Sequence, residues 1–169
     1  MAWTTPPTFV TAQVVTAAQL NQLSNDLVDL DARTRPAGAS LTAGADTTTS
    51  TTYTDLSSSV GPTVTLTTGT SVIVVVTAQM FNNNGPAAMN MMGFAVSGAT
   101  TLAASDLTAV WSDTYATAPA GNYNRMSAVS LVTGLIAGSN TFTAKYRVSS
   151  GTGTFGDRSI VVWPANNLS

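Results

Sequence analysis

The chain has 169 residues, neither cysteine nor histidine, and only 8% charged residues, with a net charge of −2. This length fits one globular domain with an additional extended arm. Without cysteine there are no disulfides and no cysteine-ligated zinc, so stability must come from packing or assembly. The single lysine, Lys145, and the five arginines are scattered apart from Arg33 and Arg35, which argues against nucleic acid as a partner.

The hydropathy of the sequence indicates whether the chain enters a membrane or is secreted. No segment reaches the roughly 18 uninterrupted apolar residues of a membrane span, and the first residues lack the basic and apolar regions of a secretory signal. We therefore expect that the protein does not insert into a membrane and that it is synthesised in the cytoplasm.

The first fifteen residues are expected to form an extended arm. Pro6 and Pro7 exclude a helix over residues 2–10. Trp3, Phe9 and Val10 would be exposed on such an arm, and exposed aromatic residues among polar ones are typical of an interaction segment. We expect the arm to dock on another protein; the alternative is that it folds back on its own domain.

A short helix is predicted over residues 16–33. Thr16 as N-cap and Gln19 three residues later form a capping box at its start. A helix of about 15 residues is marginal in water by itself, so its apolar side must pack on something. The leucines have the 3-4-3 spacing of a coiled-coil seam, which predicts a trimer interface made of Leu20, Leu23, Leu27 and Leu30.

The alternative for this helix is that it lies on its own β-domain. A Pro/Gly linker expected over residues 34–40 separates the two and argues against that alternative.

The longest apolar run, residues 71–80, predicts the central strand of the fold. Ile73 and Val75 point to the face opposite to that of Val72 and Val74, so both faces are apolar. One sheet of a sandwich buries only one of its faces, and the other must be covered by another subunit or a partner protein. A parallel homotrimer would cover both this strand and the leucine seam.

From residue 41 to residue 169 the pattern is all-β. We expect an edge strand over the Thr-rich residues 46–54, a hairpin joining residues 63–67 to the central strand, and a hairpin loop at residues 151–153. Residues 142–148 alternate cleanly between apolar and polar side chains. About eight strands at spacings near ten residues predict a jelly-roll-like antiparallel β-sandwich, here called the head domain.

The sequence gives little support for catalysis. The familiar acid/base and nucleophilic arrangements need histidine, cysteine or a carboxylate pair, and the only acidic residues are aspartates. Asp106 and Asp113 have no spacing that marks a glycosidase pair. We therefore predict no enzyme activity, no metal and no cofactor.

One loop-rich stretch is a candidate ligand surface. Trp111, Tyr115 and Tyr123 lie within it, and their rings could stack on sugars. The alternative is ordinary packing.

The N-terminal residues resemble those of a known group of proteins. Ala2-Trp3-Thr4-Thr5-Pro6-Pro7, followed by Val15-Thr16-Ala17-Ala18-Gln19-Leu20-Asn21 and a short leucine-repeat helix, resembles the N-terminal signature of small fibre and decoration proteins of tailed bacteriophages and prophages. Such proteins are typically trimers in which the arm and helix attach to the virion and a β-rich domain projects outward.

The resemblance implies a minor structural protein of the virion, either a head fibre or capsid decoration protein or a tail fibre. Its partners would be copies of itself and capsid or tail proteins. The arm residues that would make the attachment are Trp3, Thr4, Thr5, Pro6, Pro7, Phe9 and Val10. The alternative function is a host-adhesion module of the tail or baseplate that recognises a glycan or a protein.

Overall fold

A computed structural model describes residues 7–42, 44–84, 88–114 and 123–165. Helix α1 spans Ala17–Thr34, and a short 3-10 helix, η1, spans Asp106–Thr108. The strands are β1 Ala37–Leu41, β2 Asp46–Thr48, β3 Thr63–Thr68, β4 Ser71–Asn82, β5 Ala88–Gly98, β6 Val110–Thr114, β7 Asn124–Thr133, β8 Gly138–Val148 and β9 Gly153–Pro164. The chain is mainly β with one N-terminal helix, as the sequence predicts.

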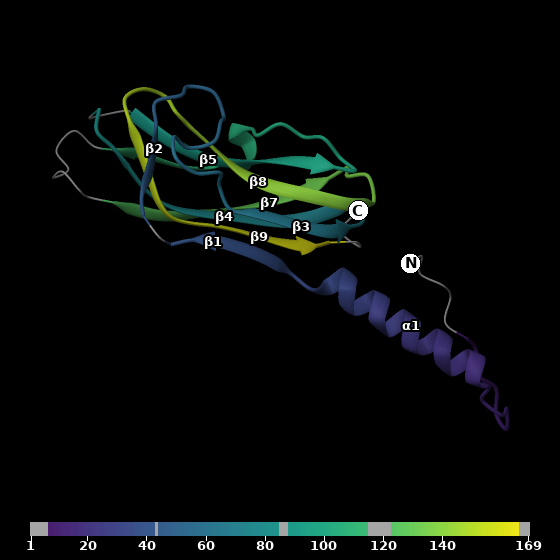
Figure 1. The fold of residues 1–169 in the computed structure, drawn as a ribbon. Coiled ribbons are helices and arrows are strands. Elements are labelled where there is room, and N and C mark those ends of the chain that lie inside the picture. The colour runs from purple at the N-terminus through teal and green to yellow at the C-terminus, as the bar shows by residue number, and fades with distance from the viewer. Residues whose placement is uncertain (1–6, 43, 85–87, 115–122, 166–169) are drawn as a thin grey trace.

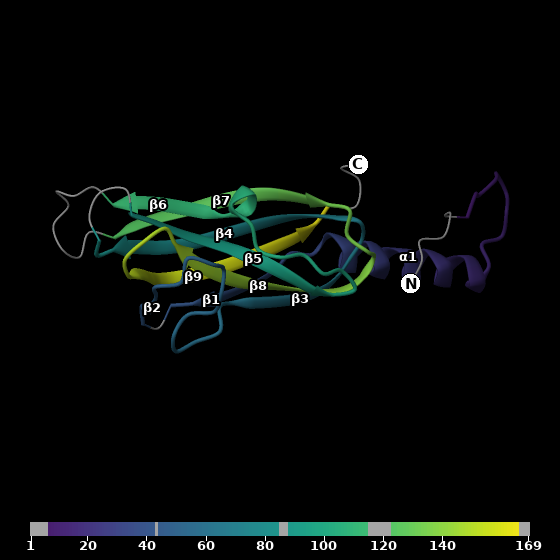
Figure 2. The ribbon, with the colours of Figure 1, turned by 90° about the horizontal axis from the view of Figure 1, so that it is seen from above.

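The strands form two antiparallel sheets that pack face to face (Figures 1 and 2). Sheet A has the order β1-β9-β4-β7, with β2 also paired to β9, and sheet B has the order β3-β8-β5-β6. Among the strands described, β5 and β6 alone are both consecutive and paired. The chain otherwise passes repeatedly from one sheet to the other, which is the wrapping of a jelly roll. The predicted fold class is confirmed.

Both predicted hairpins are wrong. Strand β3 pairs with β8 in sheet B, whereas β4 pairs with β7 and β9 in sheet A. The connection at residues 151–153 likewise joins β8 of sheet B to β9 of sheet A. Turn residues signal that the chain reverses, but they do not determine whether the next strand stays in the same sheet or crosses the core.

The core lies between the two sheets and follows the predicted alternation. Strand β8 sends its apolar residues inward, and the central strand β4 does the same with every second residue. The fully buried side chains include Val72, Val74, Phe94, Phe142, Ala144, Tyr146, Val148, Phe155 and Ile160. Ring contacts join the sheets and strands, with the centroids of Tyr146 and Phe155 5.0 Å apart in an edge-to-face arrangement.

Helix α1 extends away from one end of the sandwich (Figure 1). Its predicted capping box is confirmed, because the Gln19 backbone N–H donates to Thr16 Oγ1 at 3.3 Å and the Thr16 N–H donates to Gln19 Oε1 at 3.0 Å. The predicted linker over residues 34–40 is mostly strand, since β1 begins at Ala37 and pairs with β9. Arg35 and Pro36 alone therefore connect α1 to sheet A.

The predicted edge strand over residues 46–54 is confirmed only at β2. After Thr48 the chain leaves sheet A, and residues 49–62, here called the covering segment, run beside β8 of sheet B. Thr54 and Tyr146 exchange backbone hydrogen bonds of 3.0 and 2.9 Å, and the Val148 N–H donates to the Ser50 carbonyl at 2.8 Å. Threonine-rich sequence has high strand propensity, but here the polar contacts of the segment determine its path.

Candidate assembly surface, ligand groove and polar network

The four leucines of the predicted seam are exposed on the single chain. They are between 37% and 62% exposed, whereas Gln19, Gln22 and Asp29 on a neighbouring face of α1 are half-buried and Asp26 is buried. The head domain therefore does not cover the seam. Burying one leucine contributes on the order of 1.5 to 3 kcal/mol, so the seam Leu20, Leu23, Leu27 and Leu30 has a large free-energy gain available from a partner.

The arm is described only in its second half. Phe9 and Val10 are exposed and Pro7 is half-buried, while Trp3, Thr4, Thr5 and Pro6 lie outside the described residues. The predicted extended conformation is wrong at residues 10–13, where the Gln13 N–H donates to the Val10 carbonyl at 3.1 Å and closes a turn. Phe9 and Val10 thus precede this turn with their apolar surfaces in solvent.

A groove of about 740 Å³ lies along one long edge of the sandwich, between strand β6 of sheet B and strand β7 of sheet A. Trp111 and Tyr123 line it and are both exposed, so the structure brings two of the three predicted ligand residues to one place. Tyr115 lies outside the described residues. The Tyr123 ring also contacts the ring of Phe81, with centroids 5.6 Å apart.

Polar groups line the groove as well as aromatic ones. Asp113 and Arg125 line it from opposite strands, and Asn124 Nδ2 donates to Ser112 Oγ at 3.4 Å across the gap between the sheets. Aromatic faces beside carboxylate, guanidinium and amide groups can stack on a ring and hydrogen-bond its hydroxyl groups.

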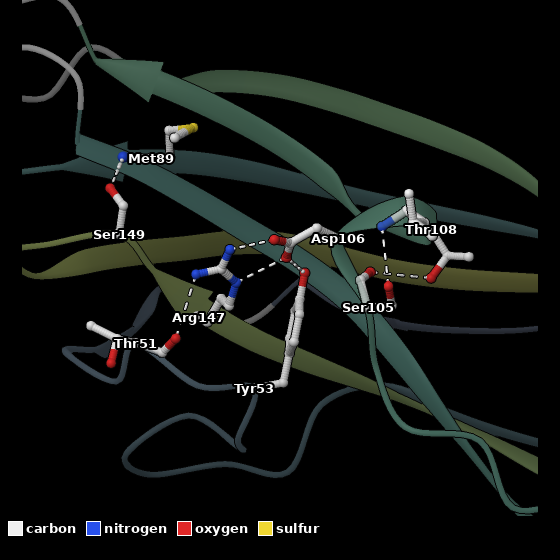
Figure 3. A network of polar contacts seen from close by, with 9 residues as sticks. Thr51, Tyr53, Met89, Ser105, Asp106, Thr108, Arg147 and Ser149 are labelled. Atoms are coloured by element: carbon white, nitrogen blue, oxygen red, sulfur yellow. Dashed lines mark hydrogen bonds and ion pairs between the residues drawn. The ribbon is translucent and has the colours of Figure 1, made fainter.

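Asp106, the other aspartate considered for catalysis, belongs to a polar network on the outer surface of sheet B. Figure 3 shows the Arg147 guanidinium and the Asp106 carboxylate pointing at each other and the Tyr53 hydroxyl reaching the same carboxylate. Arg147 Nε donates to Asp106 Oδ1 at 2.9 Å, its Nη2 donates to Oδ2, and Tyr53 Oη donates to Oδ1 at 2.8 Å. The guanidinium also lies over the Tyr53 ring, 5.6 Å from its centroid.

This network of Tyr53, Asp106 and Arg147, here called the clip, joins the covering segment and η1 to strand β8. The hydrogen bonds from Arg147 and then from Tyr53 hold the pKa of the Asp106 carboxyl below its usual value. Burial, and next the bond to Asp106, raise the pKa of the Tyr53 phenol. Both groups therefore keep their charge states at neutral pH, which is the opposite of what acid/base catalysis needs. Gly93 makes room for the clip, since a Cβ there would lie 3.2 Å from the Tyr53 ring.

A second cluster fixes the ends of the covering segment. The buried Asp46 carboxylate accepts hydrogen bonds from the Thr47 N–H at 2.8 Å, Ser57 Oγ at 2.8 Å, the Ser58 N–H at 3.1 Å and Ser59 Oγ at 2.9 Å. Burial raises the pKa of this carboxyl, but the four hydrogen bonds outweigh burial and hold the pKa well below its usual range. Asp46 therefore stays ionised inside the fold.

Two further cations support the covering segment. Lys145 Nζ contacts both oxygens of Asp55 at 2.8 and 2.9 Å, and the buried Arg158 donates from Nη1 to Ser59 Oγ at 3.3 Å. Together with Arg147, three of the six basic residues of the chain bind this segment or its clip. Sequence reasoning missed these contacts because they join residues 40 to 100 positions apart. The low content of charged residues could have indicated such contacts, since a charged residue in a strand of a chain with so few of them is expected to have a partner.

Neither a metal centre nor a membrane segment is found in the described part of the chain. Among the described residues, the aspartates form no group of three or more that could hold a metal ion. The helices of this part of the chain include none with the length and apolar character required to cross a bilayer.

Comparisons with known proteins identify the fold alone. No protein-family model matches the chain, and no curated protein sequence matches it. Among solved structures, Eiger TNF from S. frugiperda matches with a TM-score of 0.50 and 14% identity over 80% of this chain and 97% of that one. A protein of infectious bursal disease virus, Gx strain, matches with a TM-score of 0.42 and 14% identity over 79% of this chain and 33% of that one, a likeness too low to argue from.

Proposed function

We propose that the chain is a non-enzymatic structural protein of a tailed-phage virion, a homotrimeric head fibre or capsid decoration protein or a tail fibre. The observation that carries the proposal is helix α1, which projects from the jelly roll with its whole leucine seam in solvent. A seam in 3-4-3 spacing is complementary to copies of itself in parallel register. The resemblance of the arm and helix to phage fibre and decoration proteins supports the same function.

The order of parts along the molecule fits attachment through the N-terminus. The described arm residues 7–15 precede the far end of α1, and 18 helical residues at 1.5 Å per residue place the start of the helix about 27 Å from its junction with the sandwich. Phe9 and Val10 offer apolar surface there. Three arms on one trimer would add avidity, so that weak single contacts could hold the protein on a particle.

Truncation tests the attachment. Deleting residues 1–10 should leave a folded homotrimer that no longer incorporates into virions, and Trp3→Ala should weaken incorporation by itself, since a buried tryptophan anchor contributes about 2 kcal/mol or more. The measurement is occupancy on purified particles. Trp111→Ala, which removes an exposed tryptophan of the head domain, is the matched control and should incorporate normally. Normal occupancy of the truncated chain would refute attachment by the arm.

A second candidate function is a host-surface binding module of the tail or baseplate. The groove between β6 and β7 favours it, because Trp111 and Tyr123 line that groove together with Asp113 and Arg125. Binding of the wild-type trimer to a glycan array, lost in Trp111→Ala, would support this function, and no binding to any glycan or host-surface protein would argue against it.

A further inference from the structure

The outer face of sheet A carries a block of apolar side chains arranged in two rows across three strands. In the first row Ile73 of β4 lies opposite Leu131 of β7 and Trp163 of β9. In the second row Val75 of β4 lies opposite Val129 of β7 and Val161 of β9. We call these six residues the bare face.

Solvent reaches this surface on the single chain. Val129 is 71% exposed, Leu131 is 52% exposed and Trp163 is 38% exposed, while the other three residues are half-buried by their neighbours. Edge strand β1 continues the surface with the small residues Gly38 and Ser40, so that β1 itself places no large side chain beside it. A contiguous apolar surface of this kind is uncommon on a monomer and marks an interaction site.

The character of the surface changes along the sheet. Next to the bare face comes a hydroxyl row, in which Thr77 lies opposite Ser127 and Ser159. Beyond it Gln79 lies opposite Arg125, whose guanidinium is 3.7 Å from the Asp157 carboxylate. Apolar residues thus occupy one end of the sheet, and charged residues begin only at the other end.

The apolar end is the end next to helix α1. Strand β1 starts at Ala37 opposite Val162 of β9, three residues after the helix finishes at Thr34, so the helix leaves the sandwich at the end of sheet A that carries the bare face. Figure 1 shows α1 leading directly into β1. Two exposed apolar surfaces, the leucine seam and the bare face, therefore lie at the same end of the molecule.

We infer that the bare face is a subunit contact of the head domain and that a second copy of this chain covers it. The inference rests on the proposed self-association through α1. When two subunits associate through the leucine seams of their helices, their two copies of sheet A come close together, because only Arg35 and Pro36 lie between the helix and the sheet. The contact between head domains is then effectively intramolecular, so a modest apolar surface suffices. Because neither row contains a charged side chain, burying the bare face in a subunit contact does not require the desolvation of charged groups.

Fluorescence quenching of Trp163 tests the contact in the full chain. Trp3→Phe with Trp111→Phe leaves Trp163 as the sole tryptophan, and Trp3→Phe with Trp163→Phe leaves Trp111. On the single chain the two indoles are comparably exposed, at 38% and 53%. At micromolar concentrations we expect acrylamide to quench Trp163 several-fold less than Trp111, and dilution that dissociates the oligomer should remove most of this difference.

The outcomes separate this inference from the proposed function. If sedimentation shows an oligomer in which acrylamide quenches Trp163 as readily as Trp111, the bare face is not a subunit contact, although α1 still associates. If deleting residues 1–10 exposes Trp163 in an intact oligomer, the arm and not a second copy covers the face, and the inference is also overturned. Normal virion incorporation of the chain that lacks residues 1–10, with Trp163 still protected in the oligomer, would refute attachment by the arm and support the subunit contact.

The variant Leu131→Lys provides a second, independent test of the subunit contact. A charge in the first row should raise the dissociation constant of the oligomer about tenfold or more, since a buried leucine is worth at least about 1.5 kcal/mol. Thr67→Lys, which adds a lysine to an exposed position of sheet B, is the matched control and should leave the constant unchanged. Equal dissociation constants for the two variants, both with unchanged circular dichroism, would overturn the inference.

Discussion

The two sheets of this jelly roll treat their outer faces differently. Part of the outer face of sheet B is covered by its own chain: the Tyr53 ring lies over Gly93, the network of Tyr53, Asp106 and Arg147 lies over β5 and β8, and Met91 on that face is only 4% exposed. Sheet A presents the bare face, with Val129 in solvent. The covering segment packs where charged side chains of sheet B can bind it, whereas the bare face of sheet A has no charged side chain and is left exposed.

This difference separates two kinds of stabilisation. The covering segment is fixed by hydrogen bonds and ion pairs within one chain, so its contribution does not depend on protein concentration. The bare face and the leucine seam contribute only when another molecule covers them, so their contribution follows mass action. Variants of the first surface should therefore change folding, and variants of the second should change assembly.

The largest effect on the covering segment should come from Asp46→Asn. Each carboxylate oxygen of Asp46 accepts two hydrogen bonds, and an amide nitrogen in either position would face two donors. We expect a loss of about 2 to 4 kcal/mol in the free energy of unfolding, measured by denaturant titration at equal protein concentrations. Ser127→Ala on the hydroxyl row of sheet A is the control and should cost far less.

The same carboxylate predicts a pH dependence. Its folded pKa lies well below its usual range, and the unfolded value is about 3.9, so its contribution is present above about pH 4 and is lost as the pH falls further. The difference in stability between wild type and Asp46→Asn should shrink on acidification. A difference that stays constant from about pH 6 to about pH 3 would contradict the role of the ionised carboxylate.

A smaller effect is expected from the clip. Arg147→Ala should cost about 1 kcal/mol, because it removes two charge-assisted bonds to a carboxylate that is partly exposed. Tyr53→Phe removes one hydrogen bond and should cost about 0.5 kcal/mol. Both variants should keep the dissociation constant of the oligomer unchanged, and a weakened oligomer in either would break the separation between the two faces.

Local features of the fold could be predicted from the sequence. The capping box of Thr16 and Gln19 depends on neighbouring residues, and the alternation of residues 142–148 depends only on which side chains are apolar. Both are confirmed. The two-sided apolar character of residues 71–80 likewise indicated that the outer face of the central strand would need cover.

Strand pairing and the polar clusters could not be predicted in the same way. The turn between β3 and β4 reverses the chain, but the partner of β3 is β8, which begins 70 residues after the end of β3. The side chains that donate hydrogen bonds to Asp46 and the carboxylate that accepts from Arg147 come from separate segments of the chain. Contacts of this kind depend on the folded topology, so single-sequence patterns carry no information on them.

Sedimentation equilibrium of the full chain tests the central claim most directly, because we propose that other copies of the chain cover both the exposed leucine seam and the bare face. The account predicts a particle of three times the 17.3 kDa chain at micromolar concentration. It also predicts dissociation of Leu23→Asp with Leu27→Asp into folded chains with an intact β signal in circular dichroism. A wild-type protein that sediments as a monomer at micromolar concentration would contradict the account.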